Sequence, residues 1–445
     1  MSMRVLLVIN ATLDPRRERQ IAAGAYPRKD YLELRDALGA DVLDLAALER
    51  RFWTRLTRRV AGAAVAQALL GWALTPRYDA VYADRETTGF VLAALRKVLP
   101  RRGPRGRRAR LTMIGHLLSP PGKQSLVRGL RLQREIDAVV VHSSLQARLA
   151  ERTLGLRPAQ VALIPYQADD RFWSPRAASE ASAAPVANRI CSAGLEYRDY
   201  QTLIDAVADL PVDLTIAAAS PWSAFAFEGG GRALPANVRV ASFDYAALRD
   251  LYASSLFVVA PLRDVENQAG ITTILEAMSM GKAVVVSHTR GQTDVVRDRR
   301  RLSRADPARS SQPDWARRLG ATDDAALGQT GLYVRPGDPD ELRRAIVYLL
   351  EHPEEARRIG ANGRRVVEQT MGIDPFTRRM AAIITGTTHA THATHATHAT
   401  HATHATHATH ATHATHATHA THAAAHDSIG EGLRRHGRQG RDAPG

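Results

Sequence analysis

The segment best suited to chemistry covers residues 267–287, with the sequence NQAGITTILEAMSMGKAVVVS. Its pattern predicts a loop, a helix that begins near Ile271 or Thr272, a glycine turn and a buried strand. Ala269 and Gly270 allow the loop backbone to approach a ligand closely. The free amide hydrogens at the start of such a helix bind phosphate well. The segment therefore predicts a phosphate-binding loop.

Glu276 stands one to two turns into that helix. It lies too far along to reach the phosphates, but its carboxylate is placed to accept hydrogen bonds from the hydroxyl groups of a ribose. The alternative is a solvated surface residue, because LEAM is also ordinary helix sequence. Taken alone, the segment leaves the role of Glu276 open.

Short apolar runs rich in Val, Ile and Leu alternate with helical periodicity, which is the pattern of parallel strands joined by crossover helices. The strands predicted in the first half cover residues 4–9, 41–45, 80–83, 110–114, 138–141 and 161–164. After a connector rich in Pro, Ser and Ala, strands are predicted at residues 189–193, 213–217, 238–241, 256–260, 283–287 and 331–334. We therefore expect an α/β protein with two doubly wound domains.

Two further segments are not expected to join either core. Residues 297–329 are rich in Arg, Asp, Ala and Ser, which predicts a surface insertion. From Thr388 to Ala423 the chain repeats Thr-His-Ala, a composition that predicts a disordered His-rich tail. Its imidazoles are able to bind zinc, copper or nickel, but expansion of a codon repeat is the simpler explanation.

The segments around the phosphate-binding loop follow one another in a characteristic order. They are SAGLEYRDYQTLIDAV at residues 192–207, NVRVASFDYAALRDLYASSLFVVAP at 237–261, RGQTDVV from Arg290, GLYVRPGDPDELRRAI at 331–346 and then HPEEARRIGANGRRVVE. In the first half, VVVHSSLQARLAERTLGL and VALIPYQADDRFWSP extend the series. Together they resemble glycosyltransferase family 4, and the resemblance spans nearly all of residues 1–385.

The resemblance implies the GT-B architecture, in which two Rossmann-like domains face each other. It predicts an acceptor-binding domain at residues 1–173, a linker at 174–188 and a nucleotide-sugar-binding domain at 189–370. Residues 371–386 are expected to form a helix that packs back on the N-terminal domain, before the tail at 387–445. The implied activity is transfer of a hexose from a UDP- or GDP-linked donor, with retention of configuration, to a glycolipid, polysaccharide or small metabolite.

The same resemblance assigns roles in the C-terminal half. Arg198, just after the predicted strand 189–193, is expected to stabilise the departing diphosphate as a catalytic group. Gln268 takes the place of the first of the family's paired glutamates, eight positions before Glu276, and is expected at the donor sugar. The expected donor-binding residues are Gly194, Arg198, Ala269, Gly270, Ile271, Thr272 and Glu276.

Three departures from the family pattern bear on activity. Leu195 stands where the family commonly has Arg, so one phosphate contact is missing. Gln268 can hydrogen-bond a sugar but holds no negative charge, and Glu266 is the alternative carboxylate. The usual Gly-Gly after the first strand is absent, so acceptor recognition is expected to differ. These departures motivate a second hypothesis, a non-catalytic protein that binds sugar nucleotides on the same fold.

The resemblance also implies an acceptor side in the N-terminal half. His116 follows a predicted strand and is expected at the reacting centre, as a catalytic and acceptor-binding residue. Glu86, after the predicted strand 80–83, is expected to bind acceptor hydroxyls. Asp169 and Asp170 resemble the family's linker turn rather than a metal-binding pair. We therefore expect no metal and no cofactor other than the nucleotide sugar, which is a substrate.

The composition indicates the cellular compartment in which the protein is expected. Cys191 is the only cysteine, so neither an intramolecular disulfide nor a Cys-based zinc site can form. Apolar runs long enough to span a bilayer are absent from the sequence, and the first residues do not resemble a secretory signal. We expect a soluble protein of the reducing cytoplasm.

The formal net charge of +15 is concentrated in the first half, where residues 1–175 hold 30 Lys and Arg against 16 Asp and Glu. Such a surface attracts nucleic acid, anionic lipid or anionic substrates. Nucleic acid is not an expected partner, because aromatic residues make up only 5% of the chain. Residues 48–74 combine clustered Arg with apolar residues at near-helical spacing and resemble an interfacial helix. The alternatives for this segment are contact with the inner face of an anionic membrane and ordinary packing on the sheet.

Overall fold

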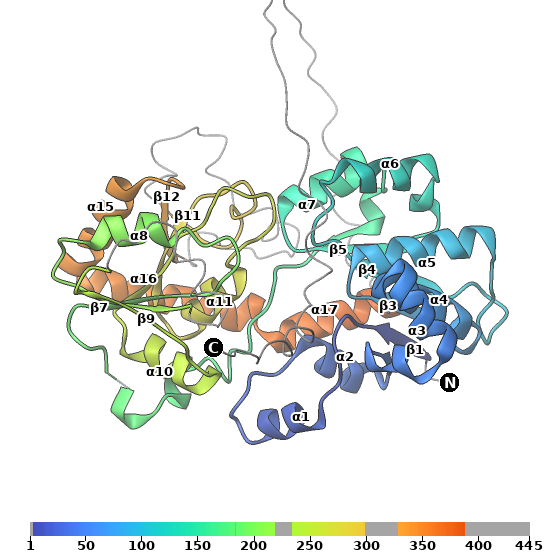
Figure 1. The fold of residues 1–445 in the computed structure, drawn as a ribbon, viewed down its shortest axis with the longest axis horizontal. Coiled ribbons are helices and arrows are strands. Elements are labelled where there is room, and N and C mark those ends of the chain that lie inside the picture. The colour runs from blue at the N-terminus through green and yellow to red at the C-terminus, as the bar shows by residue number, and fades with distance from the viewer. Residues whose placement is uncertain (1–2, 183, 219–233, 299–327, 388–445) are drawn as a thin grey trace, which may run out of the picture. The chain divides into compact units, whose positions relative to one another are not determined.

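The computed structural model describes residues 3–182, 184–218, 234–298 and 328–387. Most of the predicted insertion at 297–329 and nearly all of the tail at 387–445 lie outside these residues. Within them the chain forms two six-stranded sheets, and every strand pair is parallel. The predicted fold class, two doubly wound α/β domains, is confirmed (Figure 1).

The first sheet has the strand order β2-β1-β3-β4-β5-β6. Its strands are β1 (Val5–Val8), β2 (Asp41–Leu43), β3 (Ala80–Ala83), β4 (Arg110–Ile114), β5 (Ala138–Val141) and β6 (Val161–Leu163). Residues of β1 and β3 are buried throughout, which explains why they read as unbroken apolar runs rather than alternating ones. The observed strands agree with the predicted ones to within two residues at each end.

The second sheet has the order β12-β11-β10-β7-β8-β9. Its strands are β7 (Arg189–Ala193), β8 (Asp213–Ala217), β9 (Val238–Ala241), β10 (Phe257–Ala260), β11 (Ala283–Ser287) and β12 (Gly331–Val334). The chain starts in the middle of this sheet, builds outward through β8 and β9, and then returns to add β10 on the other side of β7. In such sheets the point where the strand order reverses is where ligands bind.

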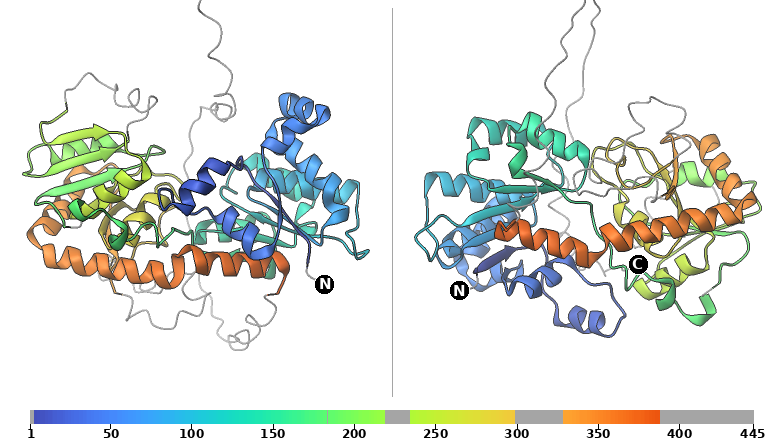
Figure 2. Two further views of the ribbon diagram at one scale, coloured as in Figure 1. Left: turned by 90° about the horizontal axis from the view of Figure 1, so that it is seen from below. Right: turned by 180° about the vertical axis from the view of Figure 1, so that it is seen from behind.

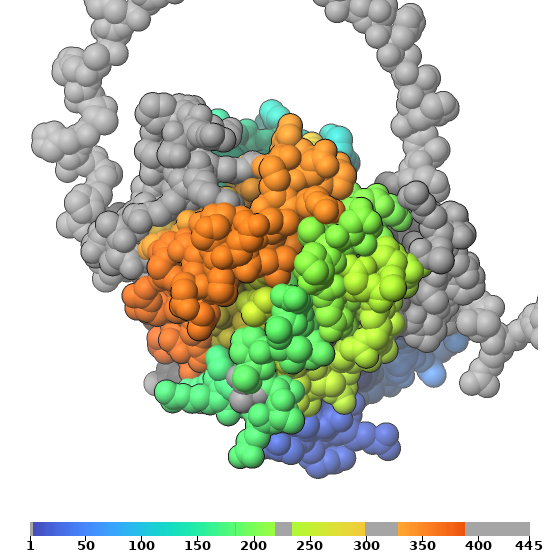
Figure 3. Space-filling view, turned by 90° about the vertical axis from the view of Figure 1, so that its left-hand side faces the viewer, coloured from blue at the N-terminus to red at the C-terminus, as the bar shows by residue number. Residues whose placement is uncertain are grey.

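Helices connect the strands and cover the sheets. In the first domain they are α1 (Pro15–Ala22), α2 (Asp30–Leu38), α3 (Phe52–Ala61), α4 (Ala63–Leu74), α5 (Glu86–Val98), α6 (Pro121–Gly129) and α7 (Ser144–Arg148). In the second they are α8 (Tyr200–Val207), α10 (Tyr245–Ser254), α11 (Ile271–Ser279), α15 (Pro339–Glu351) and α16 (Pro353–Val366). Figure 3 shows α15 and α16 in orange on the surface of the second domain.

The last helix, α17 (Ile373–Thr385), belongs to the first core although it follows the second domain in sequence. Phe376, Met380 and Ile384 are four residues apart and so share one face of the helix. All three are buried in the cluster that contains Leu7 and Ile9. Figure 2 shows α17 in orange-red running on from α16 to the blue elements of the first domain.

The segment 48–74 does not form one continuous helix. Gly62 has φ +86° and separates α3 from α4. Ala66, Leu70 and Gly71 of α4 are buried, so the apolar second half of the segment packs in the core. The first half, α3, is described below. No helix in the described part of the chain is long and apolar enough to cross a membrane.

Candidate active site

The carboxyl ends of β7 and β10 lie where the strand order of the second sheet reverses. β7 is followed by Gly194 and Arg198, and β10 by the loop that leads into α11. An isolated bridge between Arg198 and Leu262 ties the two loops together. The topology therefore brings the two predicted donor-binding segments side by side at the edge where this fold binds ligands.

Arg198 lies in the turn before α8, and its guanidinium folds back over the end of the sheet. Its Nε donates to the carbonyl of Ala193 at 2.8 Å, and its Nη2 donates to the hydroxyl of Thr273 at 2.9 Å. A third bond goes to the carbonyl of Glu196. The residue is only 8% exposed, and in the described part of the chain these bonds all go to uncharged oxygens. Burial lowers the pKa of Arg198, but the group stays cationic.

Two glycines make room for this guanidinium. Gly194 has φ +100°, and a Cβ there would lie 2.2 Å from Nη2 of Arg198. Gly270 has φ +76°, and a Cβ there would lie 2.9 Å from the side chain of Leu262 and 3.4 Å from Nη1 of Arg198. Both positions have left-handed backbone that favours glycine. The sequence predicted that the backbone at Gly270 comes close to a ligand. In the structure this backbone also lies close to the guanidinium of Arg198.

Helix α11 begins at Ile271, directly after Gly270, and no side chain caps it. The amide of Ile271 donates to the carbonyl of Gln268 at 3.3 Å. The next two amides, those of Thr272 and Thr273, have no acceptor within the helix and lie at the positive end of its dipole. Thr272 is exposed and Ala269 is buried. The carbonyl of Ala269 accepts a hydrogen bond from Gln292 at 3.1 Å, which fixes the loop. An uncapped helix start beside a buried cation is suited to a phosphate group.

Glu276 is partly buried and accepts a hydrogen bond at Oε2 from the hydroxyl of Tyr252 at 3.0 Å. Burial raises the pKa of Glu276 to about 7, against the opposing effects of Tyr252, Lys29 and Arg198. An ordinary solvated glutamate would show no such shift. The partial burial of Glu276 and its hydrogen bond to Tyr252 exclude the alternative of a solvated surface residue.

Gln268 and Glu266 occupy different surroundings. Nε2 of Gln268 is buried and has no hydrogen-bond partner in the described part of the protein. The carboxylate of Glu266 forms an ion pair with Arg290 at 3.0 Å. An unused amide donor is available to a sugar hydroxyl, whereas Glu266 is already paired. The structure therefore favours Gln268 over Glu266 as the group that would meet a donor sugar.

In the first domain, His116 follows β4 and is exposed. Its backbone amide donates to Oε2 of Glu86 at 3.1 Å, and its Nε2 lies 3.1 Å from the carbonyl oxygen of Asp84. A carbonyl only accepts, so Nε2 carries the proton in this hydrogen bond. In the neutral ring, Nδ1 then remains as an acceptor for a ligand hydroxyl.

Glu86 begins α5 and is 5% exposed. Besides His116, it binds Nζ of Lys123 at 2.6 Å through Oε1. Both carboxylate oxygens therefore accept hydrogen bonds from the protein itself. The structure brings the two predicted acceptor-side residues together, and Glu86 holds the backbone of the His116 loop.

Three further polar residues near His116 were not predicted. Asp84 directly follows β3 and accepts a hydrogen bond from the amide of Asn10 at 2.6 Å, and burial raises its pKa to about 6. Burial also raises the pKa of Asp30. The ring of His142 lies 5.7 Å from that of His116, and burial lowers its pKa to about 3. The rule that ligands gather at strand ends could have found Asp84, since it follows the predicted strand 80–83. No local signal marks Asp30, the first residue of α2, as a site residue.

Contacts between residues of the two sheets' domains lie close to these groups. Both oxygens of Asp294 bind Ser144, one accepting from its amide at 2.7 Å and the other from its hydroxyl at 2.8 Å. Nζ of Lys29 lies 4.9 Å from the ring centre of Tyr26 and 5.5 Å from that of Tyr245. The sequence offered no motif for the contacts of Ser144 with Asp294 and of Lys29 with Tyr245, because each joins residues that are more than 100 positions apart.

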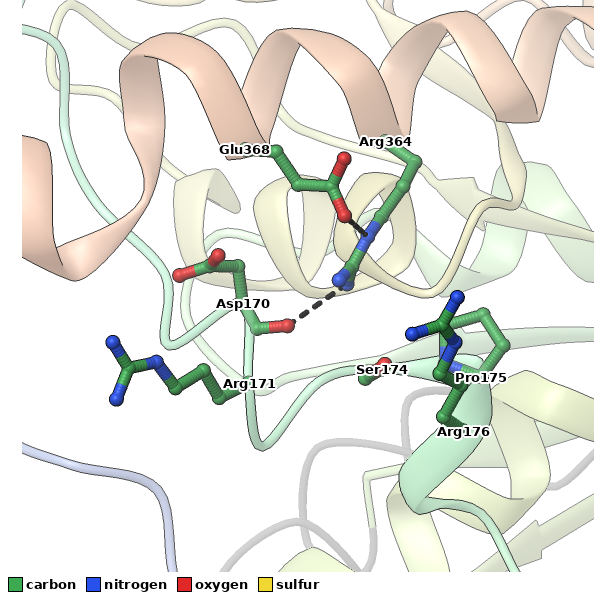
Figure 4. Close-up of a pocket in the computed structure, with 7 residues that line it drawn as sticks. All are labelled: Asp170, Arg171, Ser174, Pro175, Arg176, Arg364 and Glu368. Atoms are coloured by element: carbon green, nitrogen blue, oxygen red, sulfur yellow. Dashed lines mark hydrogen bonds and ion pairs between the residues drawn. The ribbon is translucent and has the colours of Figure 1, made fainter.

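A cavity of about 430 Å³ lies away from the predicted residues, at the chain segment that joins the domains. It is lined by Asp170, Arg171, Ser174, Pro175, Arg176, Arg364 and Glu368. Figure 4 shows Arg364 between Glu368 and the carbonyl of Asp170. Arg364 also donates to the carbonyls of Trp173 and Ser279. We interpret this cavity as part of the structural connection between the domains, because the guanidinium of Arg364 at its centre already donates its hydrogen bonds to protein oxygens. Clusters of three or more His, Cys, Asp or Glu suited to a metal are not found in the described residues.

A comparison with known protein families gives a match in the second domain, which contains the donor-side residues. Residues 189–352 match the family model described as glycosyl transferases group 1. The second domain is therefore similar to group 1 glycosyltransferases over residues 189–352. The match contains Gly194, Arg198 and the loop and first turns of α11, so the donor-side residues lie inside the matched region. The predicted resemblance to glycosyltransferases is confirmed for this region of the chain, at the level of group 1.

Solved structures with the same fold include glycosyltransferases. HepE of Anabaena, in complex with UDP-glucose, matches with 16% identity and a TM-score of 0.56, over 86% of this chain and 100% of its own. Sucrose-phosphate synthase of Thermosynechococcus elongatus matches with 16% identity and a TM-score of 0.58, over 86% of this chain and 99% of its own. The catalytic domain of starch synthase IV of Arabidopsis thaliana, bound to ADP and acarbose, matches with 13% identity and a TM-score of 0.56, over 87% of this chain and 99% of its own. These likenesses establish the GT-B fold. A search of curated protein sequences gave no match.

Proposed function

We propose that this protein is a retaining glycosyltransferase that moves a hexose from a UDP- or GDP-linked donor to an acceptor hydroxyl. The observation that carries the proposal is the buried Arg198 guanidinium, which lies beside an uncapped helix start within the region similar to group 1 glycosyltransferases. Solved proteins of the same fold are complexed with UDP-glucose and with ADP, which supports a nucleotide sugar as the ligand.

In the reaction a new bond forms from the acceptor oxygen to the anomeric carbon, and the acceptor's proton passes to the departing phosphate. The bond between the anomeric carbon and the phosphate oxygen breaks, and the electron pair leaves with the diphosphate. Negative charge therefore grows on the phosphate, and a fixed cation together with oriented amides lowers the barrier. Arg198 and the first turn of α11 take these roles. Because both are held before the donor arrives, little reorganisation is needed during the reaction. We propose that the reaction needs no metal and no cofactor.

The remaining donor contacts follow from the same placement. Glu276 accepts hydrogen bonds from the ribose hydroxyls, and Gln268 donates its free amide hydrogen to the sugar. His116 binds a hydroxyl at the reacting centre through Nδ1. Glu86 acts on His116 by holding its backbone amide, and is a positioning residue in this proposal. The acceptor is a glycolipid, a polysaccharide or a small metabolite, and we place the protein in the cytoplasm.

Gln268 and the exposed Leu195 also motivate a second candidate function, binding of a sugar nucleotide without transfer. A donor screen separates the two. The full chain is incubated with a panel of UDP- and GDP-sugars, with and without acceptor mixtures, and products are followed by mass spectrometry and free-nucleotide release. The transferase predicts turnover with at least one donor, which the Arg198→Ala variant lacks. Tight binding of a nucleotide with no release from any donor would favour the binding protein.

A further inference from the structure

Helix α3 has its apolar side chains on the outside. Within α3, which the structure describes in full, Thr54 is the one buried residue. Its hydroxyl donates to the carbonyls of Leu48 at 2.6 Å and Arg51 at 2.8 Å. The next helix, α4, shows the usual arrangement, with Ala66 and Leu70 buried in the core. The side of α3 that faces the domain is thus held by a polar residue.

The exposed side of α3 carries an apolar stripe. Phe52 is 73% exposed, Leu56 is 51% exposed and Val60 is 79% exposed. Residues four apart lie one above the other on a helix, and Trp53, which is 41% exposed, borders the stripe. At about 100° per residue, Thr54 lies about 160° around the helix from Leu56. The stripe therefore points away from the domain.

Arginines gather in and just before α3. Arg55 and Arg59 border the stripe, whereas Arg58 lies on the Thr54 side of the helix. Arg50, Arg51, Arg55, Arg58 and Arg59 are all exposed. Helix α3 itself contains no acidic residue. The nearest carboxylate, that of Glu49, forms an ion pair with Arg58. An exposed apolar stripe edged by charges of one sign is the composition of a helix that lies in the interface of an anionic membrane.

The charge pattern favours a lipid surface over a second copy of the chain as the partner of the α3 stripe. A symmetric dimer through α3 would bring two sets of arginines together across one interface, and like charges in contact oppose association. A lipid surface instead lets the apolar groups enter the acyl boundary while the arginine heads stay at the phosphates. The helix is about 15 Å long, which suits contact with the surface rather than crossing.

We propose that α3 docks on an anionic lipid surface, with Phe52, Leu56 and Val60 inserted and the bordering Arg55 and Arg59 bound to lipid phosphates. Docking adds a membrane partner to the proposed function but does not depend on it, since the residues of α3 are separate from those of the donor site. Each arginine contributes roughly fivefold to the affinity for an anionic leaflet.

The chain offers a specific probe for insertion. Cys191 is its only cysteine and is fully buried, so a fluorophore whose emission depends on polarity can be attached selectively to Leu56→Cys. The labelled full chain is titrated with phosphatidylcholine vesicles and with vesicles that also contain phosphatidylglycerol. The titration is done at about pH 8, where exposed histidines are neutral. We expect a blue shift with the anionic vesicles alone, weakened by salt. The same label at Arg19→Cys, on the polar helix α1, should show no shift.

Co-sedimentation of unlabelled variants gives the second readout. Phe52→Ser, Leu56→Ser and Val60→Ser together should abolish binding to the anionic vesicles. Arg55→Gln with Arg59→Gln should weaken binding roughly 25-fold. The matched control, Arg16→Gln with Arg19→Gln, removes the same charge from α1 and should weaken it far less. Nucleotide binding by each variant serves as the check on folding.

Three results would overturn the proposal. The first is equal, negligible binding of the wild-type chain to both kinds of vesicle. The second is binding that the serine variant retains in full, because charge elsewhere would then suffice. The third is a wild-type dimer that the serine variant converts to a monomer, which would assign the stripe to a second copy. Each of these results is compatible with full donor turnover. The membrane-docking proposal can therefore fail while the proposed function holds.

Discussion

The two domains hold their candidate groups in opposite ways. In the second domain, Arg198 is buried with hydrogen bonds to uncharged oxygens, and α11 begins without a cap. In the first domain, Glu86 is buried with both oxygens bound to Lys123 and to the amide of His116. The first arrangement leaves positive charge for a ligand, whereas the second is complete within the protein. Substitution of Arg198 should therefore affect function, whereas substitution of Glu86 should affect stability.

The largest effect is expected from Arg198→Ala. Removing a preorganised cation from the site of developing charge should lower turnover by about two to three orders of magnitude. The melting temperature should hold, because the substitution removes a buried charge that has no carboxylate partner in the described structure. Steady-state kinetics with the donor found by the screen measures this effect. Arg344→Ala, an exposed arginine of α15, is the matched control and should change neither quantity. Equal losses in turnover and in donor affinity would reduce Arg198 to a binding role.

Glu276→Ala should come next, with donor binding weaker by about 1.5 to 3 kcal/mol because hydrogen bonds to a charged acceptor are lost. Calorimetric titration with the nucleotide sugar measures it. In the wild-type protein this affinity should rise between about pH 6 and pH 8, because the pKa of Glu276 is raised to about 7 and the ionised form is the better acceptor. A Glu276→Ala variant with wild-type affinity would remove this residue from the site.

Glu276→Gln tests the same group through stability. The folded protein raises the pKa of Glu276 from 4.5 to about 7, so folding favours the protonated carboxyl. Its stabilising effect is complete below pH 4.5 and is lost as the pH rises through 7. The Gln variant cannot ionise and should exceed the wild type in unfolding free energy by about 2 kcal/mol at pH 8, with no gain at pH 4.5. Denaturant melts at the two pH values measure the difference, and a gain that does not vary with pH would contradict the assigned cause.

The smallest effect is expected from Glu86→Ala, and it should appear in stability. The substitution leaves Lys123 without its carboxylate and the amide of His116 without its acceptor, at a cost of about 1 to 2 kcal/mol. Lys123→Ala should cost a similar amount, and the double variant should cost less than the sum because the two side chains act as one unit. Donor affinity should not change in any of the three. A loss of acceptor affinity with unchanged stability would mean that Glu86 faces the acceptor after all.

The same contrast explains what the sequence could predict. The strands and the start of α11 were predicted nearly to the residue, because long apolar runs and a glycine before a helix are local signals. The joining of Gly194, Arg198 and Gly270 followed from topology, since strand ends at a reversal of strand order meet. The placement of Arg198 over Gly194 was not predictable, because it depends on backbone angles that no motif records.

The first domain was harder to predict for a physical reason. Lys123 lies 37 residues from its partner Glu86, and only the folded sheet brings them together. The resemblance predicted His116 and Glu86 as site residues. It could not show that both carboxylate oxygens of Glu86 accept hydrogen bonds from Lys123 and from the amide of His116. The residues 48–74 contained the composition of an interfacial helix, whereas the direction of its apolar stripe required the break at Gly62 and the burial of Thr54.

The central claim is that the second domain holds the nucleotide at the ends of β7 and β10. Hydrogen exchange with and without saturating UDP or GDP, followed by peptide mass spectrometry, tests it most directly. The account predicts slower exchange in peptides that cover residues 194–200 and 268–276, and no change in peptides around His116 when the nucleotide alone is bound. Protection confined to the first domain, or bound nucleotide without protection of residues 194–200 and 268–276, would contradict the account.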